Sequence, residues 1–131
     1  MSYGAKSYKS TSIQTATPEQ VLLMLYEGAI KATKLAKLAI EKKNMAEKGK
    51  QIGKVHDILM ELSNTLDHSK SPDVSGQLSS LYDFCIAQLF KANMENDANS
   101  LDSVVKVLTT LYEGWVSAVQ EIRKTAKKEK T

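Results

Sequence analysis

Apolar residues recur along this chain at the spacing of α-helices, in four segments separated by polar breaks. We expect the first helix to run from Pro18 to about Lys43 and the second from about Ala46 to Asp67. The third is expected from about Val74 to Glu95, and the fourth from about Leu101 to Thr125. No segment alternates with the two-residue period of a half-buried β-strand. The pattern therefore predicts an all-α protein that folds as an antiparallel up-down four-helix bundle.

Residues typical of helix starts and turns bound these segments. Thr17 can cap the first helix, Pro18 suits its first position, and Gln20 completes a capping box. The breaks between helices are NMAEKG at 44–49, HSKSPDVSG at 68–76 and NDANS at 96–100. Because all three breaks are short, consecutive helices are expected to lie antiparallel.

The predicted bundle occupies residues 17–125 and leaves a segment at each end of the chain. The first segment, residues 1–16, is polar and without helical periodicity, so we expect a flexible N-terminal segment. It nevertheless contains Tyr8 and Ile13, which could cap a groove of the bundle until a partner arrives. Residues 126–131 are expected to form a basic C-terminal tail.

Each helix has one apolar face that is expected to point into the bundle. At about 100° per residue, these faces supply a predicted core with contributions from all four helices. The core residues predicted in this way are Leu25, Tyr26, Leu62, Leu66, Leu81, Tyr82, Leu89, Leu108, Leu111 and Trp115.

The first and third helices carry more apolar residues than one core-facing stripe requires. The run VLLMLY at 21–26 wraps the whole circumference of a helix. Two residues of the first helix, Leu23 and Ile30, fall outside the face that points into the core. Phe84 and Phe90 flank the core row of the third helix on opposite sides. Grooves between the helices could therefore accept apolar residues of a partner. The alternative is that lysine stems and the N-terminal segment partly cover these side chains.

Charge and composition limit the classes of partner. The formal net charge is only +3, and the lysines are spread along the chain apart from the cluster KTAKKEKT at 124–131. Nucleic-acid binding would require a denser basic stripe. No apolar run approaches the roughly 20 residues of a membrane span, so no membrane insertion is expected. The single cysteine, Cys85, suits a reducing compartment, and we expect a cytoplasmic protein.

The sequence offers little for catalysis or metal binding. The two histidines, His56 and His68, belong to no Glu-x-x-His pair, which excludes a carboxylate di-metal site of the bundle type. Cys85 lies on an inward apolar row, where burial makes a thiol unreactive. Glycine-rich phosphate loops and Gly-x-Ser-x-Gly motifs are missing from the sequence. We therefore expect no enzyme activity, no catalytic residues, no metal and no cofactor.

Three stretches of the chain resemble the signature stretches of a known family. They are YKSTSIQTATPEQVLLMLYEGAIK at 8–31, LSSLYDFCIAQLFKAN at 78–93 and VLTTLYEGW at 107–115. In sequence and spacing they are similar to FliS, the family of flagellar export chaperones that bind flagellin. One departure is Ala5, which stands where a second aromatic residue is expected before Tyr8.

The resemblance implies a cytoplasmic chaperone that binds the C-terminal helical region of flagellin, prevents its premature polymerisation and presents it to the flagellar type III export apparatus. It also implies that Tyr8 and Ile13 cap a groove until flagellin displaces them. Tyr26 and Trp115 could be core anchors or client contacts, and Asn93 could serve a helix end or the partner's backbone. Combined with the surplus apolar residues, it predicts the client-binding residues Leu23, Met24, Ile30, Phe84, Phe90 and Asn93.

Two alternatives to the chaperone hypothesis remain open at this point. The extra apolar faces could pack against copies of the same chain, giving a self-assembling bundle such as a homodimer. The scattered lysines and the C-terminal tail could instead bind an anionic surface.

Overall fold

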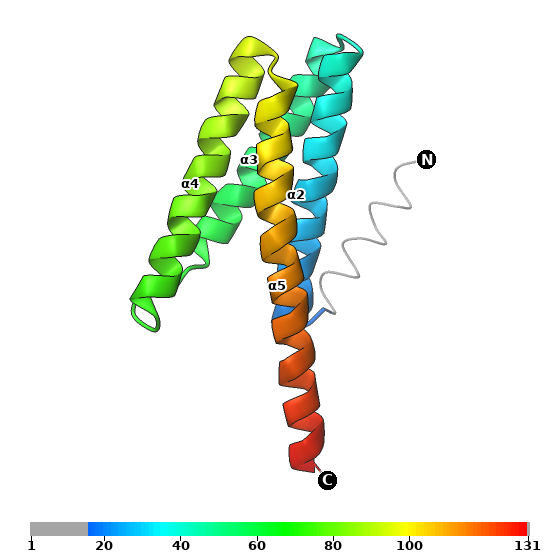
Figure 1. Cartoon of the computed structure of the whole chain (residues 1–131). Helices are drawn as coiled ribbons and strands as arrows, with labels where there is room; N and C mark the ends of the chain where they lie inside the picture. The colour runs from blue at the N-terminus through cyan, green and yellow to red at the C-terminus, as the bar shows by residue number, and fades with distance from the viewer. Residues whose placement is uncertain (1–15, 131) are drawn as a thin grey trace.

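The computed structural model describes residues 16–130 and confirms an all-α four-helix bundle (Figure 1). The four helices of these residues are α2 (Pro18–Glu41), α3 (Met45–Asn64), α4 (Pro72–Glu95) and α5 (Ala98–Lys130). Tyr8 and Ile13, the residues predicted to cap a groove, lie outside the described residues. Among the described helices, none is long and apolar enough to span a membrane.

Consecutive helices run antiparallel, and each helix packs against two neighbours (Figure 1). The order around the bundle is α2, α3, α4, α5, so that α2 lies diagonally across from α4 and α3 from α5. The fourth helix, α5, has 33 residues and is therefore about 50 Å long. Its C-terminal part extends beyond the ends of the other three helices (Figure 1).

The helix starts follow from local capping chemistry. The predicted capping box of α2 is present: the Gln20 backbone N–H donates to Thr17 Oγ1 at 3.2 Å, and the Thr17 N–H donates to Gln20 Oε1 at 2.9 Å. The helix α4 begins at Pro72 rather than Val74, because proline is favoured in the first turn. The helix α5 begins at Ala98 rather than Leu101, directly after Asp97.

Three helix ends differ from the predicted ones. The helix α2 stops at Glu41, and Lys43 in the following turn has a left-handed backbone with φ of 58°. The helix α3 stops at Asn64, three residues before the predicted Asp67. The helix α5 continues past the predicted Thr125 to Lys130, so the predicted basic tail at 126–131 is helical as far as residue 130. Neither glycine nor proline follows Gly114, and the last residues are mostly good helix formers.

The core contains side chains from all four helices. Five predicted core residues are buried: Tyr26, Leu62, Tyr82, Leu89 and Leu108. Four others are half-buried and pack against this core: Leu25, Leu66, Leu111 and Trp115. The prediction for Leu81 is wrong, since this residue is half-buried outside the core cluster and lines a surface hollow near the start of α4. Leu81 directly precedes the inward Tyr82 and so points about 100° away from it.

Hydrogen bonds link helices in the core of the bundle and at one of its ends. The hydroxyl groups of Tyr26 and Tyr82 lie 2.5 Å apart in the core and join α2 to α4. At the end of α4, the buried Lys48 donates from Nζ to the Asn93 carbonyl oxygen at 2.9 Å and to Asn96 Oδ1 at 2.7 Å. A lysine ammonium at the C-terminal end of a helix is favourably placed for the helix dipole.

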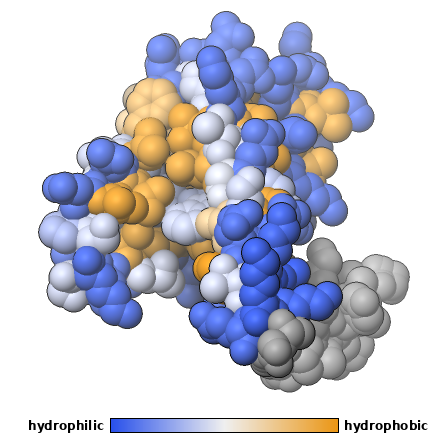
Figure 2. Space-filling model, turned by 60° about the horizontal axis from the view of Figure 1, so that its bottom comes forward, coloured by the Kyte–Doolittle hydropathy of each residue, from blue (hydrophilic) through white to orange (hydrophobic). Residues whose placement is uncertain are grey.

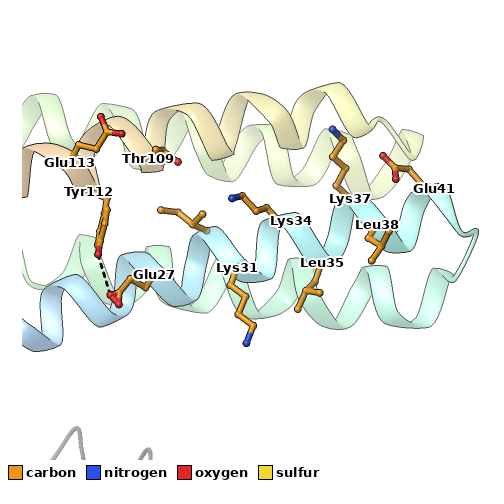
Figure 3. Close-up of a pocket in the computed structure, with 11 residues that line it drawn as sticks. Glu27, Lys31, Lys34, Leu35, Lys37, Leu38, Glu41, Thr109, Tyr112 and Glu113 are labelled. Atoms are coloured by element: carbon orange, nitrogen blue, oxygen red, sulfur yellow. Dashed lines mark hydrogen bonds between the residues drawn. The ribbon is translucent and has the colours of Figure 1, made fainter. Parts of the chain in front are cut away.

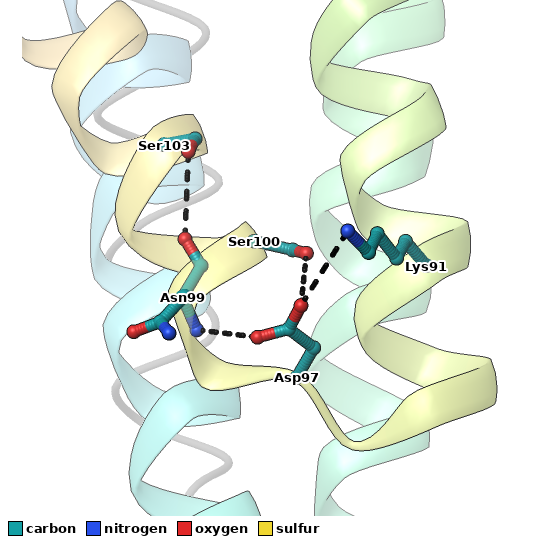
Figure 4. A network of polar contacts seen from close by, with 5 residues as sticks. All are labelled: Lys91, Asp97, Asn99, Ser100 and Ser103. Carbon is teal, nitrogen blue, oxygen red and sulfur yellow. Dashed lines mark hydrogen bonds and ion pairs between the residues drawn. The ribbon is translucent and has the colours of Figure 1, made fainter.

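The turn between α4 and α5 is organised by Asp97 (Figure 4). Its carboxylate accepts the Asn99 backbone N–H and the Ser100 hydroxyl, each at 3.0 Å, and lies 3.8 Å from Lys91 Nζ. These contacts, chiefly the Ser100 hydroxyl bond, lower the pKa of Asp97. The residue therefore caps α5 and links its start to α4.

Candidate functional site

Large apolar side chains remain on the surface of the bundle. In Figure 2, in which the lower end of the molecule of Figure 1 comes forward, hydrophobic residues gather in the left and middle of the face shown, and a smaller group lies at the upper right. The helix α4 carries several large exposed apolar residues, including Phe84 and Phe90. The large apolar residues that are exposed are Leu35, Leu38, Met45, Met60, Val74, Phe84, Phe90, Met94 and Ile122.

One surface groove lies between α3 and α4 and has a volume of about 270 Å³. Phe90 forms one wall with 57% of its surface exposed, and the ring of His56 lies across from it at a centroid distance of 6.0 Å in an edge-on arrangement. The residues that line this groove, called the α3–α4 groove below, are Gly49, Ile52, Gly53, His56, Asp57, Leu89, Phe90 and Asn93.

Two glycines leave part of the α3 wall of this groove without side chains. Gly49 and Gly53 are one helical turn apart, and a Cβ added to either would meet no heavy atom of the described residues within 4 Å. Both have ordinary helical backbone, since no described glycine has a positive φ. Each glycine costs about 1 kcal/mol of helix stability relative to alanine. Because neither the backbone nor the packing of the free chain requires glycine here, the open space over α3 is the feature that a partner could use.

A second groove of about 850 Å³ lies between α2 and α5 (Figure 3). Its apolar surface comes mainly from α2, and lysines and glutamates surround that surface. The residues that line this groove, called the α2–α5 groove below, are Glu27, Ile30, Lys31, Lys34, Leu35, Lys37, Leu38, Glu41, Thr109, Tyr112 and Glu113.

Polar contacts tie the two walls of the α2–α5 groove together. The Tyr112 hydroxyl donates to Glu27 Oε2 at 3.2 Å, as the dashed line in Figure 3 marks. Nearby, Lys37 Nζ lies 2.8 Å from Asp102 Oδ1, and this bond raises the pKa of Lys37. Loss of solvation, followed by the charge of Glu27, raises the pKa of Tyr112. These two pairs link α2 to α5 at the groove.

The structure divides the predicted client-binding residues among several places. Phe90 and Asn93 line the α3–α4 groove, whereas Ile30 lines the α2–α5 groove. Phe84 is exposed on α4, on the opposite flank of the helix from Phe90. Leu23 and Met24 are half-buried on α2 and lie outside the residues that line these two grooves.

The predicted set also missed groove residues. Leu35 and Leu38 line the α2–α5 groove, and their positions away from the core face of α2 were the available signal. Gly49 and Gly53 were missed because a sequence does not show whether space over a glycine is empty. Asn93 serves a helix end through its carbonyl oxygen, which accepts Lys48, while the residue itself is exposed beside the groove.

The single cysteine and two of the tyrosines, Tyr26 and Tyr82, lie in the core. Burial raises the pKa of the Cys85 thiol to about 12, so this cysteine stays protonated near neutral pH. Burial also raises the pKa of Tyr26 and of Tyr82. Within residues 16–130, no group of three or more histidine, cysteine or acidic side chains is arranged to hold a metal ion.

Comparisons with known proteins identify the family of this chain and agree with its fold. The family model described as "Flagellar protein FliS" matches residues 1–122. The flagellar secretion chaperone FliS of Bacillus subtilis is 35% identical over 118 residues, which cover 90% of this chain and 87% of that protein. The protein of the same name from Salmonella typhimurium is 33% identical over 117 residues, covering 86% and 87%.

A similar protein is known from Vibrio cholerae, where the flagellar secretion chaperone FliS is 32% identical over 114 residues, 84% of each chain. Among solved structures, a crystal structure of a flagellar chaperone from bacteria superposes with a TM-score of 0.75 over 90% of this chain and 96% of that one. Its sequence identity is 21%, so this likeness concerns the fold alone.

Proposed function

This chain belongs to the FliS family of flagellar proteins, and from that premise we propose that it is a secretion chaperone whose client is the C-terminal helical region of flagellin. Chaperoning of flagellin for export is the known role of the family, which is not a family of enzymes. In this proposal the chain acts in the cytoplasm, keeps flagellin from polymerising prematurely and delivers it to the flagellar type III export apparatus.

The observation that carries this proposal is the α3–α4 groove with its exposed Phe90 beside two bare glycines. A helix of the client can insert apolar side chains around Phe90 and approach α3 closely over Gly49 and Gly53. A segment that orders on binding must offset an ordering cost of about 2–5 kcal/mol or more. Burial of an exposed aromatic ring is an effective source of that free energy.

The α2–α5 groove supports a client that wraps around the bundle. In the helix order α2, α3, α4, α5, the two grooves lie on opposite sides. One straight helix cannot fill both of them. We therefore expect one client segment at Phe90 and Asn93 and another at Ile30, Leu35 and Leu38, joined by a linker that crosses the bundle.

The N-terminal segment is proposed to cap a client groove in the free chain, through Tyr8 and Ile13. A segment that competes with the client lowers the apparent client affinity by the fraction of chains that are capped. Deletion of residues 2–15 should therefore tighten client binding, and weaker binding of the shortened chain would reject the capping role.

Isothermal titration of the full chain with a peptide from the C-terminal region of flagellin tests the proposal. We expect binding with a micromolar or lower Kd and a negative heat-capacity change, because apolar surface is buried. Phe90→Asp should weaken binding at least tenfold. Met94→Asp is the matched control, since Met94 lies on the same helix, is 83% exposed and does not line the groove.

Three outcomes would contradict the proposal. They are the absence of peptide binding, equal affinities of the Phe90→Asp variant and the unaltered chain, and equal losses in the Phe90 and Met94 variants. The alternative is a homodimer in which the same exposed apolar residues pack against a second copy, and sedimentation of the free chain that finds only monomer would exclude it.

A further inference from the structure

The net charge of this chain is concentrated at its C-terminal end. Residues 1–119 contain 13 basic and 13 acidic residues, whereas residues 120–130 contain five basic and two acidic residues. The whole formal charge of +3 therefore lies in the last turns of α5. The grooves described above belong to the part of the chain that is neutral overall.

This charged end of α5 stands apart from the bundle. Val119 is only 5% exposed, but every described side chain from 120 to 129 is exposed. Figure 1 shows this end of the helix extending past the other three helices. We call residues 120–130 the α5 stalk. Ten residues of helix span about 15 Å, enough to enter a depression on another protein.

The α5 stalk has a basic side and a mixed side. At about 100° per residue, Arg123 and Lys127 share one side of the helix, and Glu121 and Glu129 lie opposite. Ile122 lies about 20° from Glu129 and about 100° from Arg123 around the helix, continues the apolar stripe of Val119 and is 58% exposed. Cations near a helix C-terminus are favoured by the helix dipole, but the dipole gives no reason for an exposed isoleucine among them.

We infer that the α5 stalk is a docking element for an acidic protein surface, with Ile122 as the apolar anchor and Arg123 and Lys127 as the charged contacts. An apolar anchor with charged residues at its edge is typical of protein interfaces, where a few central residues carry most of the binding energy. The concentrated charge also accelerates encounter with an acidic partner. The stalk is separate from the client grooves, so this partner can bind while the client is held.

Other occupants fit the stalk less well. A helix that lies on a lipid surface needs several large apolar residues, and the stalk has only Ile122. Nucleic-acid phosphates would contact the basic side but leave Ile122 unused. The first 15 residues contain Lys6 and Lys9 and no acidic residue, so they would be repelled. A second copy would bring an equally positive stalk and a body that is neutral overall.

Site-specific photo-crosslinking in flagellated cells, followed by titration, tests this inference. A photoreactive amino acid replaces Ile122 in the full chain, and the same amino acid replaces Met60 on α3 in the control, because Met60 is also exposed, at 42%. A protein that is crosslinked only from position 122 is then purified and titrated with the unmodified full chain.

We expect the double variant Arg123→Glu/Lys127→Glu to bind this protein at least tenfold more weakly, and Ile122→Ala to bind it several-fold more weakly. The control Lys50→Glu/Lys54→Glu makes the same charge change at two exposed lysines of α3 and should stay within twofold. Affinity for the client peptide should be unchanged in the double variant, so this test can fail without the proposed function failing. The new glutamates could weaken binding by fraying the end of the helix. Ile122→Ala keeps the charge of the stalk, so a loss of affinity in this variant does not have that cause.

Several results would overturn the inference. One is the absence of any protein that is crosslinked from position 122 but not from position 60. Another is an affinity that the double variant and Ile122→Ala leave unchanged. Phosphatidylglycerol vesicles and a 20-base-pair DNA duplex serve as the other polyanions. If the chain binds the vesicles or the DNA more tightly than it binds the purified protein, and the double variant loses that binding, the stalk is a site for lipid or nucleic acid instead.

Discussion

The helices α2 and α4 lie on opposite corners of the bundle, have 24 residues each and begin with proline. They differ in the size of the residues that they bury. The helix α2 buries a row of small residues, Ala29, Ala32, Ala36 and Ala39. The helix α4 buries Tyr82, Cys85, Leu89 and Ala92 and exposes large residues outside that row.

This difference separates two uses of apolar surface. Small buried residues let α2 approach its neighbours closely. Because the interior is close-packed, larger side chains do not fit at these positions. The outward Phe84 and Phe90 of α4 contribute little to the chain's own core and remain available to another chain. Both helices expose large apolar residues, Leu35 and Leu38 on α2 and Phe84 and Phe90 on α4. The two helices therefore differ in their core rows, which are mostly small on α2 and mostly large on α4.

The largest expected effect on stability is at Ala36, which is 0% exposed in the alanine row of α2. Ala36→Leu should lower the free energy of unfolding by about 1–3 kcal/mol, because the added atoms have no space between the helices. Urea denaturation measures the change. The same substitution at the exposed Ala87 of α4 is the control and should change stability by no more than about 0.5 kcal/mol. Equal losses at the two positions would remove the contrast between the helices.

The next effect concerns the bond that joins the two helices. Tyr82→Phe should lower the free energy of unfolding by about 1–2 kcal/mol, because it leaves the Tyr26 hydroxyl buried without its partner. The double variant Tyr26→Phe/Tyr82→Phe should lose less than the sum of the two single variants, since it leaves no unpaired hydroxyl. Thermal and urea unfolding of the four proteins give the coupling. Strict additivity would show that the hydroxyl pair does not link α2 to α4.

A smaller effect of opposite sign is expected at the glycines that face Phe90. Gly53→Ala should raise the free energy of unfolding by about 0.5–1 kcal/mol, because alanine is the better helix former and its Cβ meets no described atom. The same substitution should weaken binding of the flagellin peptide, and Gly53→Leu should weaken it further. Gly114→Ala on α5 is the control, since it should stabilise the chain equally and leave peptide binding unchanged. Unchanged peptide affinity in both Gly53 variants would exclude close approach over α3.

The smallest effect is a pH dependence at the turn that follows α4. The pKa of Asp97 is lowered in the folded chain, so its contribution to stability is present above the unfolded pKa of about 3.9 and is lost as the pH falls below it. Asp97→Asn keeps a capping side chain but removes this titration. Between pH 5 and pH 3, its melting temperature should therefore fall less than that of the unaltered chain. Parallel melting curves over this range would show that Asp97 does not stabilise the turn.

Several features of the chain were determined by the sequence alone. The number of helices, their antiparallel order and the capping box at Thr17 depend on local periodicity and on contacts between residues three or four apart. The buried positions of Tyr26, Leu62, Tyr82, Leu89 and Leu108 follow from the same periodicity. Such patterns are short-range, and for that reason they can be interpreted without knowing which helices are neighbours.

Tertiary structure alone decided which surplus apolar residues reach the surface. Leu23 and Phe90 both lie outside a core stripe, but Leu23 is half-buried, whereas Phe90 remains exposed beside α3. Leu81 illustrates the same limit, because one step of about 100° along α4 separates a core position from a surface hollow. The empty space over Gly49 and Gly53 and the projection of α5 also depend on where neighbouring helices lie and end. Exposure depends on the atoms that other helices bring to a position, and those atoms are far away in the sequence.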